Sequence, residues 1–177
     1  MNTETKVIKF EEGITLESGN HLESFELIVE TYGELNKSKS NGVLLCHAFS
    51  GNHHAAGKSE DGSIGWWDQL VGTGKAIDTN KYFVVCCNNL GGCSGSSGPT
   101  SINPKTEKIY GKDFPQVSVL DWVNSQKMLS EKLGINKWHL VIGGSLGGMQ
   151  ALQWSITFPD SVNKAGILAA AAKSSTQ

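Results

Sequence analysis

The sequence predicts a single α/β domain over residues 1–177, with a mostly parallel sheet, helices on both faces and an antiparallel edge at the start. Strand-like runs come first, and a strand–helix–strand–helix–strand order follows them, as in parallel sheets with crossover helices. The later strand-like runs are continuously apolar, which is typical of strands buried on both faces. With 38% hydrophobic residues, a chain of this length can bury one sizeable core.

The antiparallel edge is predicted from residues 7–10 and 25–31. The second run alternates apolar and charged side chains in part, which is typical of a hairpin partner at a sheet edge. Glycine and asparagine at 11–13 and 17–20 indicate turns, and the polar segment 32–42 predicts a surface loop.

One long helix is predicted over residues 118–133. Ser118 and Asp121 have the spacing of a capping box, and Gly134 is a typical residue after a helix end. Residues 65–71 predict a shorter helix. The buried parallel strands are predicted at residues 43–46, 81–87, 139–142 and 164–169.

Residues 139–154 have the order of strand, tight turn and helix. Gly143, Ser145 and Gly147 have the spacing of a nucleophile elbow, in which a strained turn exposes the serine hydroxyl at the carboxyl end of the sheet. Glycines are needed beside the serine because a Cβ there would strike the neighbouring strand or helix. A flexible glycine–serine linker is the alternative, but linkers do not normally lie between a strand and an amphipathic helix. The motif therefore predicts an α/β-hydrolase-type sheet with Ser145 as the nucleophile.

Two backbone N–H groups are candidates for the oxyanion hole. One belongs to Leu146, the residue after the nucleophile, at the positive end of the following helix. The other belongs to Phe49, in the polar loop after strand 43–46, because ligands of open α/β sheets bind at the carboxyl ends of strands.

A base for the serine is missing from the sequence. In this architecture the acid and then the histidine follow the serine along the chain, yet after Ser145 there is one acid, Asp160, and no histidine. His139 is predicted to pack within the sheet, and His47 to shape the oxyanion loop. We therefore expect an amino-terminal portion of a longer enzyme, with cap, acid and base supplied downstream, and no useful turnover from residues 1–177 alone.

Composition argues against several partners. The net charge of -2 gives no reason to expect nucleic acid or an anionic membrane as partner, and no apolar run reaches membrane-spanning length. The polar start lacks a signal-peptide core, so a cytoplasmic protein is expected. All 15 basic residues are lysines, so a bidentate arginine clamp on a carboxylate cannot come from this segment.

The four cysteines are predicted to be buried, reduced thiols, with the adjacent Cys86 and Cys87 on opposite faces of a strand. The alternative is a metal site formed by Cys46, His47, His53 and His54. The neighbouring histidines lack the three- or four-residue spacing of a helical site, so no metal is expected. The glycine-rich loop 88–99 contains no GxGxxG motif and is predicted to pack near the site rather than to bind phosphate.

Three motifs, residues 47–51, 89–99 and 143–154, resemble those of the homoserine O-acetyltransferases, α/β-hydrolase-fold enzymes of methionine biosynthesis. The resemblance runs from about Phe25 to the final residue. Phe49 and Ser50 stand where the family usually has leucine and threonine, which can alter the pocket near the acyl group. The carboxy-terminal half, which carries the family's catalytic Asp and His, is absent.

The resemblance implies a ping-pong reaction without a bound cofactor. Ser145 would take the acetyl group from the co-substrate acetyl-CoA, while the N–H groups of Phe49 and Leu146 bind the oxyanion, and the hydroxyl of L-homoserine would then accept the acetyl group. A homodimer is also implied for the full-length enzyme. Succinyl-CoA as donor, serine as acceptor, an esterase on the same fold and a non-catalytic binding protein remain alternatives.

Overall fold

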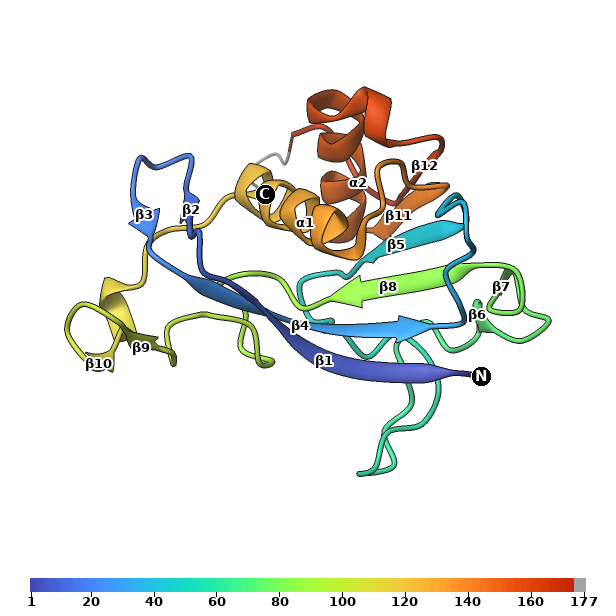
Figure 1. The fold of residues 1–177 in the computed structure, drawn as a ribbon, viewed down its shortest axis with the longest axis horizontal. Helices are drawn as coiled ribbons and strands as arrows, with labels where there is room; N and C mark the ends of the chain where they lie inside the picture. Colours follow the sequence, from blue (N-terminus) through green and yellow to red (C-terminus); the bar gives the residue numbers. More distant parts are fainter. Residues whose placement is uncertain (174–177) are drawn as a thin grey trace.

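The computed structural model describes residues 1–173, whose centre is a six-stranded sheet of order β1-β4-β8-β5-β11-β12 (Figure 1). Strands β8, β5, β11 and β12 are parallel to their neighbours in this group, whereas β4 is antiparallel to both β1 and β8. The predicted mostly parallel sheet with an antiparallel edge is confirmed. The six strands are β1 (Thr3–Phe10), β4 (Phe25–Tyr32), β5 (Gly42–Cys46), β8 (Phe83–Cys87), β11 (Leu140–Gly144) and β12 (Ala165–Leu168).

Shorter elements occupy the connections between these strands. Three two-residue strand pairs and two 3-10 turns are present in residues 1–173. They are β2 (Ile14–Thr15) with β3 (His21–Leu22), β6 (Val71–Gly72) with β7 (Ile77–Asp78), β9 (Ile102–Asn103) with β10 (Lys108–Ile109), η1 (Gly111–Asp113) and η2 (Pro159–Ser161).

Both α-helices of the described residues, α1 (Val119–Leu133) and α2 (Leu146–Thr157), lie on one face of the sheet (Figure 1). Leu44 and Cys46 of β5 pack into the core beneath them, and the alternate residues Val43 and Leu45 belong to a second core on the other face. This alternation follows from the two-residue period of a strand. Because strands are buried on both faces, their apolar runs are continuous, as the sequence indicates.

The face opposite the helices is covered by the connection between β5 and β8, so the prediction of helices on both faces is wrong for the described residues. The predicted helix at 65–71 is a series of turns followed by β6. The N–H groups of Gly65, Trp66 and Trp67 donate to carbonyls of residues 54–57, which ties the start of this segment to the loop after β5. Hydrogen bonding to residues 54–57 accompanies a turn conformation in place of the helix that the local sequence of residues 65–71 favours.

The predicted start and end of α1 are confirmed. The Ser118 hydroxyl accepts the Asp121 N–H (3.3 Å), and the Asp121 carboxylate accepts the N–H groups of Ser118 (2.8 Å) and Glu17 (2.7 Å). The helix ends at Gly134, which has a left-handed φ of 69°. The capping box therefore also joins α1 to the β2–β3 hairpin region. No helix within residues 1–173 combines the length and apolar character needed to cross a bilayer.

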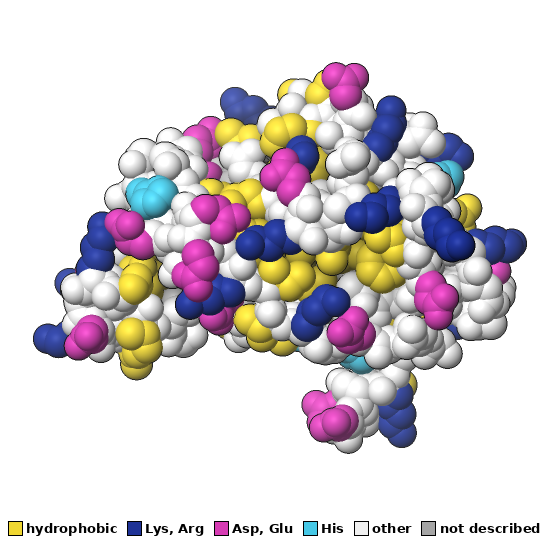
Figure 2. All heavy atoms as spheres, viewed as in Figure 1, with side chains coloured by type: hydrophobic (Ala, Val, Ile, Leu, Met, Phe, Trp, Pro, Cys, Tyr) yellow, Lys and Arg dark blue, Asp and Glu magenta, His cyan; other side chains and the backbone are white. Residues whose placement is uncertain are grey.

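Two predictions of burial are wrong. The strand predicted at 164–169 forms as β12, but it lies at the sheet edge, with Ile167 and Leu168 about two-fifths exposed, because no described strand pairs with its outer side. Cys93 is exposed in the loop after β8, whereas the other three cysteines are buried. Cys86 and Cys87 belong to the cores on opposite faces, as predicted. Figure 2 shows lysine and acidic side chains interspersed over the visible surface rather than gathered by sign.

Candidate active site

Ser145 lies at the tight turn between β11 and α2. Its backbone angles are φ 54° and ψ −121°, a conformation that costs a non-glycine residue about 1–3 kcal/mol. The Ser145 N–H donates to the Leu168 carbonyl at 2.9 Å, and its carbonyl accepts the Met149 N–H at 3.1 Å. Hydrogen bonds on both sides thus hold the turn, while the residue itself is exposed. The turn is as predicted, and the role of Ser145 as nucleophile stays a prediction.

The predicted elbow glycines are both required by close backbone contacts. A Cβ on Gly143 would lie 2.6 Å from the Cys46 carbonyl oxygen and closer still to the backbone of Gly147. A Cβ on Gly147 would overlap that same oxygen and lie 2.8 Å from the carbonyl carbon of Cys46. By contrast, a Cβ on Gly144 would meet nothing closer than the Leu168 carbonyl oxygen at 4.0 Å. The end of β5 and the start of α2 are therefore in backbone contact at the elbow.

The predicted oxyanion-hole residues lie on the two elements that meet at this contact. Leu146 is the first residue of α2, and Phe49 follows β5 by three positions. Within residues 1–173, neither backbone N–H donates to a protein acceptor. The Phe49 side chain is 89% exposed, so a role for this residue near Ser145 would come from its N–H rather than from its ring.

Phe49 and Leu146 line two cavities. One, of about 380 Å³, also contains Ser145, Met149 and residues 169–171. The other, of about 630 Å³, is mostly apolar and is lined by the loops after β5 and β8 together with Phe114, Val117 and Trp122. The glycine-rich loop after β8 therefore lies beside the site, as predicted. The two cavities meet at the backbone that carries both candidate oxyanion donors.

His47 joins the two loops that line the larger cavity. Its Nδ1 lies 2.8 Å from the Ala48 carbonyl oxygen, and its Nε2 lies 3.1 Å from the Asn89 nitrogen. Since the carbonyl can only accept and the N–H can only donate, Nδ1 carries the proton and Nε2 is the acceptor. Burial lowers the pKa of His47, which keeps the ring neutral. With both nitrogens engaged, His47 is not a base for Ser145, and the geometry agrees with the predicted role in shaping the oxyanion loop.

The other sequence candidates for acid and base lie elsewhere. His139 precedes β11, at the opposite end of that strand from Ser145, and stacks on Tyr82 with ring centroids 5.2 Å apart. Asp160 is exposed in the 3-10 turn after α2. In the described part of the chain, no His–carboxylate pair makes a hydrogen bond to Ser145. No group of three or more His, Cys, Asp or Glu side chains is arranged to hold a metal ion there.

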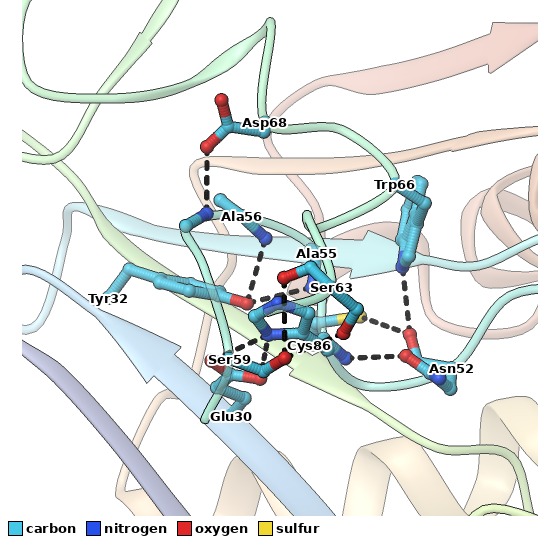
Figure 3. A network of polar contacts seen from close by, with 12 residues as sticks. Glu30, Tyr32, Asn52, Ala55, Ala56, Ser59, Ser63, Trp66, Asp68 and Cys86 are labelled. Atoms are coloured by element: carbon cyan, nitrogen blue, oxygen red, sulfur yellow. Dashed lines mark hydrogen bonds and ion pairs between the residues drawn. The ribbon is translucent and has the colours of Figure 1, made fainter. Parts of the chain in front are cut away.

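A buried polar network that sequence reasoning missed supports the connection between β5 and β8 (Figure 3). The Glu30 carboxylate accepts from His54 Nδ1, with oxygen distances of 3.0 and 3.2 Å. The Tyr32 hydroxyl accepts the N–H groups of Ala55 (2.8 Å) and Ala56 (3.1 Å). Burial, with a further contribution from Glu30, raises the pKa of Tyr32. The only available signal was that Glu30 and Tyr32, two apart in β4, share a face of the sheet.

The glutamines at positions 126 and 150 were missed as well. Both side chains are buried between α1 and α2, and they are hydrogen-bonded to each other at 2.7 Å. Helical spacing alone does not reveal a contact between two separate helices, although buried amides in apolar surroundings require partners.

Comparison with known proteins is consistent with this geometry. Residues 41–176 match the family model described as alpha/beta hydrolase fold. The chain is 59% identical over 174 residues to a homoserine O-succinyltransferase of Hahella chejuensis, covering 97% of this chain and 45% of that protein. The chain thus spans less than half the length of this curated relative.

Solved structures give the same fold. A homoserine O-acetyltransferase from Bacillus anthracis is 40% identical with a TM-score of 0.87, over 93% of this chain and 46% of that one. An esterase is 43% identical with a TM-score of 0.84, over 91% of this chain and 46% of that one. From the elbow at Ser145, the mostly parallel sheet and the match over residues 41–176, the chain belongs to the alpha/beta hydrolase fold family.

Proposed function

We propose that residues 1–177 carry the nucleophile and oxyanion hole of an acyltransferase that moves an acyl group from acyl-CoA to the hydroxyl of L-homoserine, as in methionine biosynthesis. The proposal concerns the complete polypeptide in which these residues occur, called the complete polypeptide below. The observation that carries it is the strained, exposed Ser145 at the start of α2, beside the N–H groups of Phe49 and Leu146, which have no acceptor among residues 1–173. Such donors stabilise a developing oxyanion without reorganising.

In the proposed reaction, a base outside the described residues removes the Ser145 hydroxyl proton as Oγ attacks the thioester carbonyl. The tetrahedral oxyanion accepts hydrogen bonds from the Phe49 and Leu146 N–H groups. The C–S bond breaks, and CoA leaves as a thiol after it takes the proton from the base. The homoserine hydroxyl then gives its proton to the base as it attacks the acyl-serine ester. The bond between the acyl carbon and Ser145 Oγ breaks, Oγ takes that proton from the base, and the O-acyl ester is released.

The names of the relatives do not agree on the acyl donor, so the side chains of the site are used to choose between acetyl-CoA and succinyl-CoA. The 59% identity to a protein named as a succinyltransferase supports succinyl-CoA, whereas the resolved relative named as an acetyltransferase is 40% identical. The side chains that line the two cavities include no lysine, so these residues offer a succinyl carboxylate only neutral donors. An acetyl group needs no counter-charge, and we therefore propose acetyl-CoA as the donor, with succinyl-CoA as the competitor in the test.

Acid quench of the complete polypeptide with each donor, followed by peptide mass spectrometry, tests the first step. Acetyl-CoA should leave an acetyl group on Ser145, and Ser145→Ala should abolish the modification. Faster modification by succinyl-CoA would overturn the proposed donor but not the transferase. Absence of any acyl group on Ser145 would overturn the function itself.

Ester hydrolysis is the second candidate, favoured by the 43% identity to an esterase. The acceptor distinguishes the two reactions. If the acylated enzyme transfers its acyl group to L-homoserine faster than to water, it is a transferase. If acetate release is unchanged by L-homoserine and no O-acyl ester forms, it is a hydrolase.

A further inference from the structure

Two glutamine side chains form a fully buried bridge from α1 through α2 to the end of β5. Gln150 is 0% exposed and Gln126 is 1% exposed. The Trp154 indole N–H donates to Gln126 Oε1 (2.7 Å), and Gln126 Nε2 donates to Gln150 Oε1 (2.7 Å). Gln150 Nε2 then donates to the carbonyl oxygen of His47 at 3.3 Å. We call this chain of three hydrogen bonds the glutamine bridge.

The two ends of the bridge determine its direction. An indole N–H can only donate and a backbone carbonyl can only accept, so each amide between them has one orientation that satisfies both of its neighbours. Buried amides are costly without partners, and here every link is made. The bridge therefore holds one arrangement of α1, α2 and the end of β5.

The bridge ends two residues before one candidate oxyanion donor and begins on the helices that include the other. His47 directly follows β5 and precedes Phe49 by two residues. Gln150 lies one helical turn beyond Leu146 on α2, and at the start of that helix Gly147 contacts the Cys46 carbonyl. The His47 ring is itself held by Ala48 and Asn89. The segment that carries the Phe49 N–H is thus tied to the helix that carries the Leu146 N–H.

We infer that Gln150 and Gln126 are positioning residues for the oxyanion hole, which set the separation of the Phe49 and Leu146 N–H groups and hence the rate of Ser145 acylation. This inference rests on the proposed role of Ser145. The glutamines do not touch the reacting atoms; they act through the His47 carbonyl. A loss of the bridge should lower the acylation rate constant while leaving the binding of the acyl donor almost unchanged, because the cavity walls are intact.

The test uses the complete polypeptide and p-nitrophenyl acetate, whose release of nitrophenol reports acylation without any acceptor. Gln150→Met retains side-chain length but removes the donor to His47, and Gln126→Met breaks the bridge one step further away. The acylation rate constant should fall by about tenfold to a hundredfold in Gln150→Met, as expected for misplaced catalytic groups. The half-saturating ester concentration should change less than about twofold.

Ser130→Ala is the matched control. The buried Trp138 indole N–H donates to the hydroxyl of Ser130 in α1 at 2.8 Å, and that hydroxyl donates to the Gln126 backbone carbonyl at 2.9 Å, so Ser130 contacts the main chain of Gln126 but no side-chain link of the glutamine bridge. The substitution leaves a buried indole without a partner, so it should lower the melting temperature much as Gln126→Met does, with the acylation rate unchanged. Equal acylation rates in wild type, Gln150→Met and Gln126→Met would overturn the inference, as would an equal loss of rate in Ser130→Ala. If Gln150→Met does not fold, Gln126→Met against Ser130→Ala decides the question.

Failure of the proposed function gives a different result. If wild-type Ser145 is acylated but L-homoserine takes no acyl group, only the acceptor assignment is overturned. The acylation rates of wild type and the glutamine variants then still test the role of the glutamine bridge. If neither acyl-CoA nor p-nitrophenyl acetate acylates wild-type Ser145, both proposals are overturned.

Discussion

Replacing an elbow glycine by alanine should destabilise the protein at Gly147, where the backbone is in close contact with β5, but not at Gly144, where there is space for a Cβ. A Cβ on Gly147 overlaps the Cys46 carbonyl oxygen and lies 3.1 Å from the His47 carbonyl carbon, and these atoms belong to backbone that cannot rotate away. Overpacking of this kind costs about 1–3 kcal/mol, and since the obstacle is backbone we expect about 3 kcal/mol for Gly147→Ala. At Gly144 the nearest atom would be 4.0 Å away, and alanine in a strand is favoured over glycine by about 0.5–1 kcal/mol. The two variants should therefore differ by about 3–4 kcal/mol.

Urea unfolding of the complete polypeptide, followed by tryptophan fluorescence, measures this difference, because Trp138 and Trp154 are buried reporters near α1 and α2. Gly147→Ala should unfold at clearly lower urea concentration than wild type, with Gly144→Ala at or above wild type. The acylation rate should also fall in Gly147→Ala, since the end of β5 and the start of α2 must move apart. Equal unfolding midpoints for the two alanine variants would refute the reasoning from close contact.

Three further predictions concern the oxyanion loop, the helix cap and pH. Phe49→Ala should change the acylation rate by no more than about twofold, because the ring is exposed, whereas Phe49→Pro, which lacks the N–H, should lower it by about 10²–10³ in stopped-flow assays. Asp121→Ala should lower the free energy of unfolding by about 2–3 kcal/mol in urea, since its buried carboxylate accepts the Ser118 N–H of the capping box and also the N–H of Glu17, which lies outside α1. Burial lowers the pKa of His47 and of His53, so the unfolded chain binds more protons below about pH 6.5, and stability should be complete above that pH and fall as pH decreases toward the folded-state values. His47→Gln should weaken this fall below about pH 6.5 in urea titrations, while an unchanged slope would contradict the assignment.

Short-range features of the fold could be predicted because they depend on neighbours in the chain. The capping box of Ser118 and Asp121 spans three residues, and the left-handed Gly134 follows directly from the helix end. The elbow at Ser145 was predictable from its local glycine spacing, although the contacts that require Gly147 come from the backbone of Cys46 and His47 in a distant part of the chain.

Features that join distant segments could not be predicted in this way. Residues 65–71 form turns rather than the expected helix, and the start of this segment is tied by hydrogen bonds to carbonyls at 54–57, which its own sequence does not reveal. The exposure of β12 depended on which strands lie beside it, and a buried-looking apolar run does not carry that information. Local propensity is therefore a weak guide wherever a long-range hydrogen bond or a sheet neighbour competes with it.

By itself the sequence determined the class of fold, the turn that exposes Ser145 and the loops that surround it, because periodicity and glycine spacing are local properties of a chain. The tertiary structure alone decided that both ring nitrogens of the neutral His47 are hydrogen-bonded and that Gln126 and Gln150 join α1 and α2 to the loop after β5. The physical reason is that a buried polar atom must find its partner in space, and the partner here lies as far as 103 residues away along the chain.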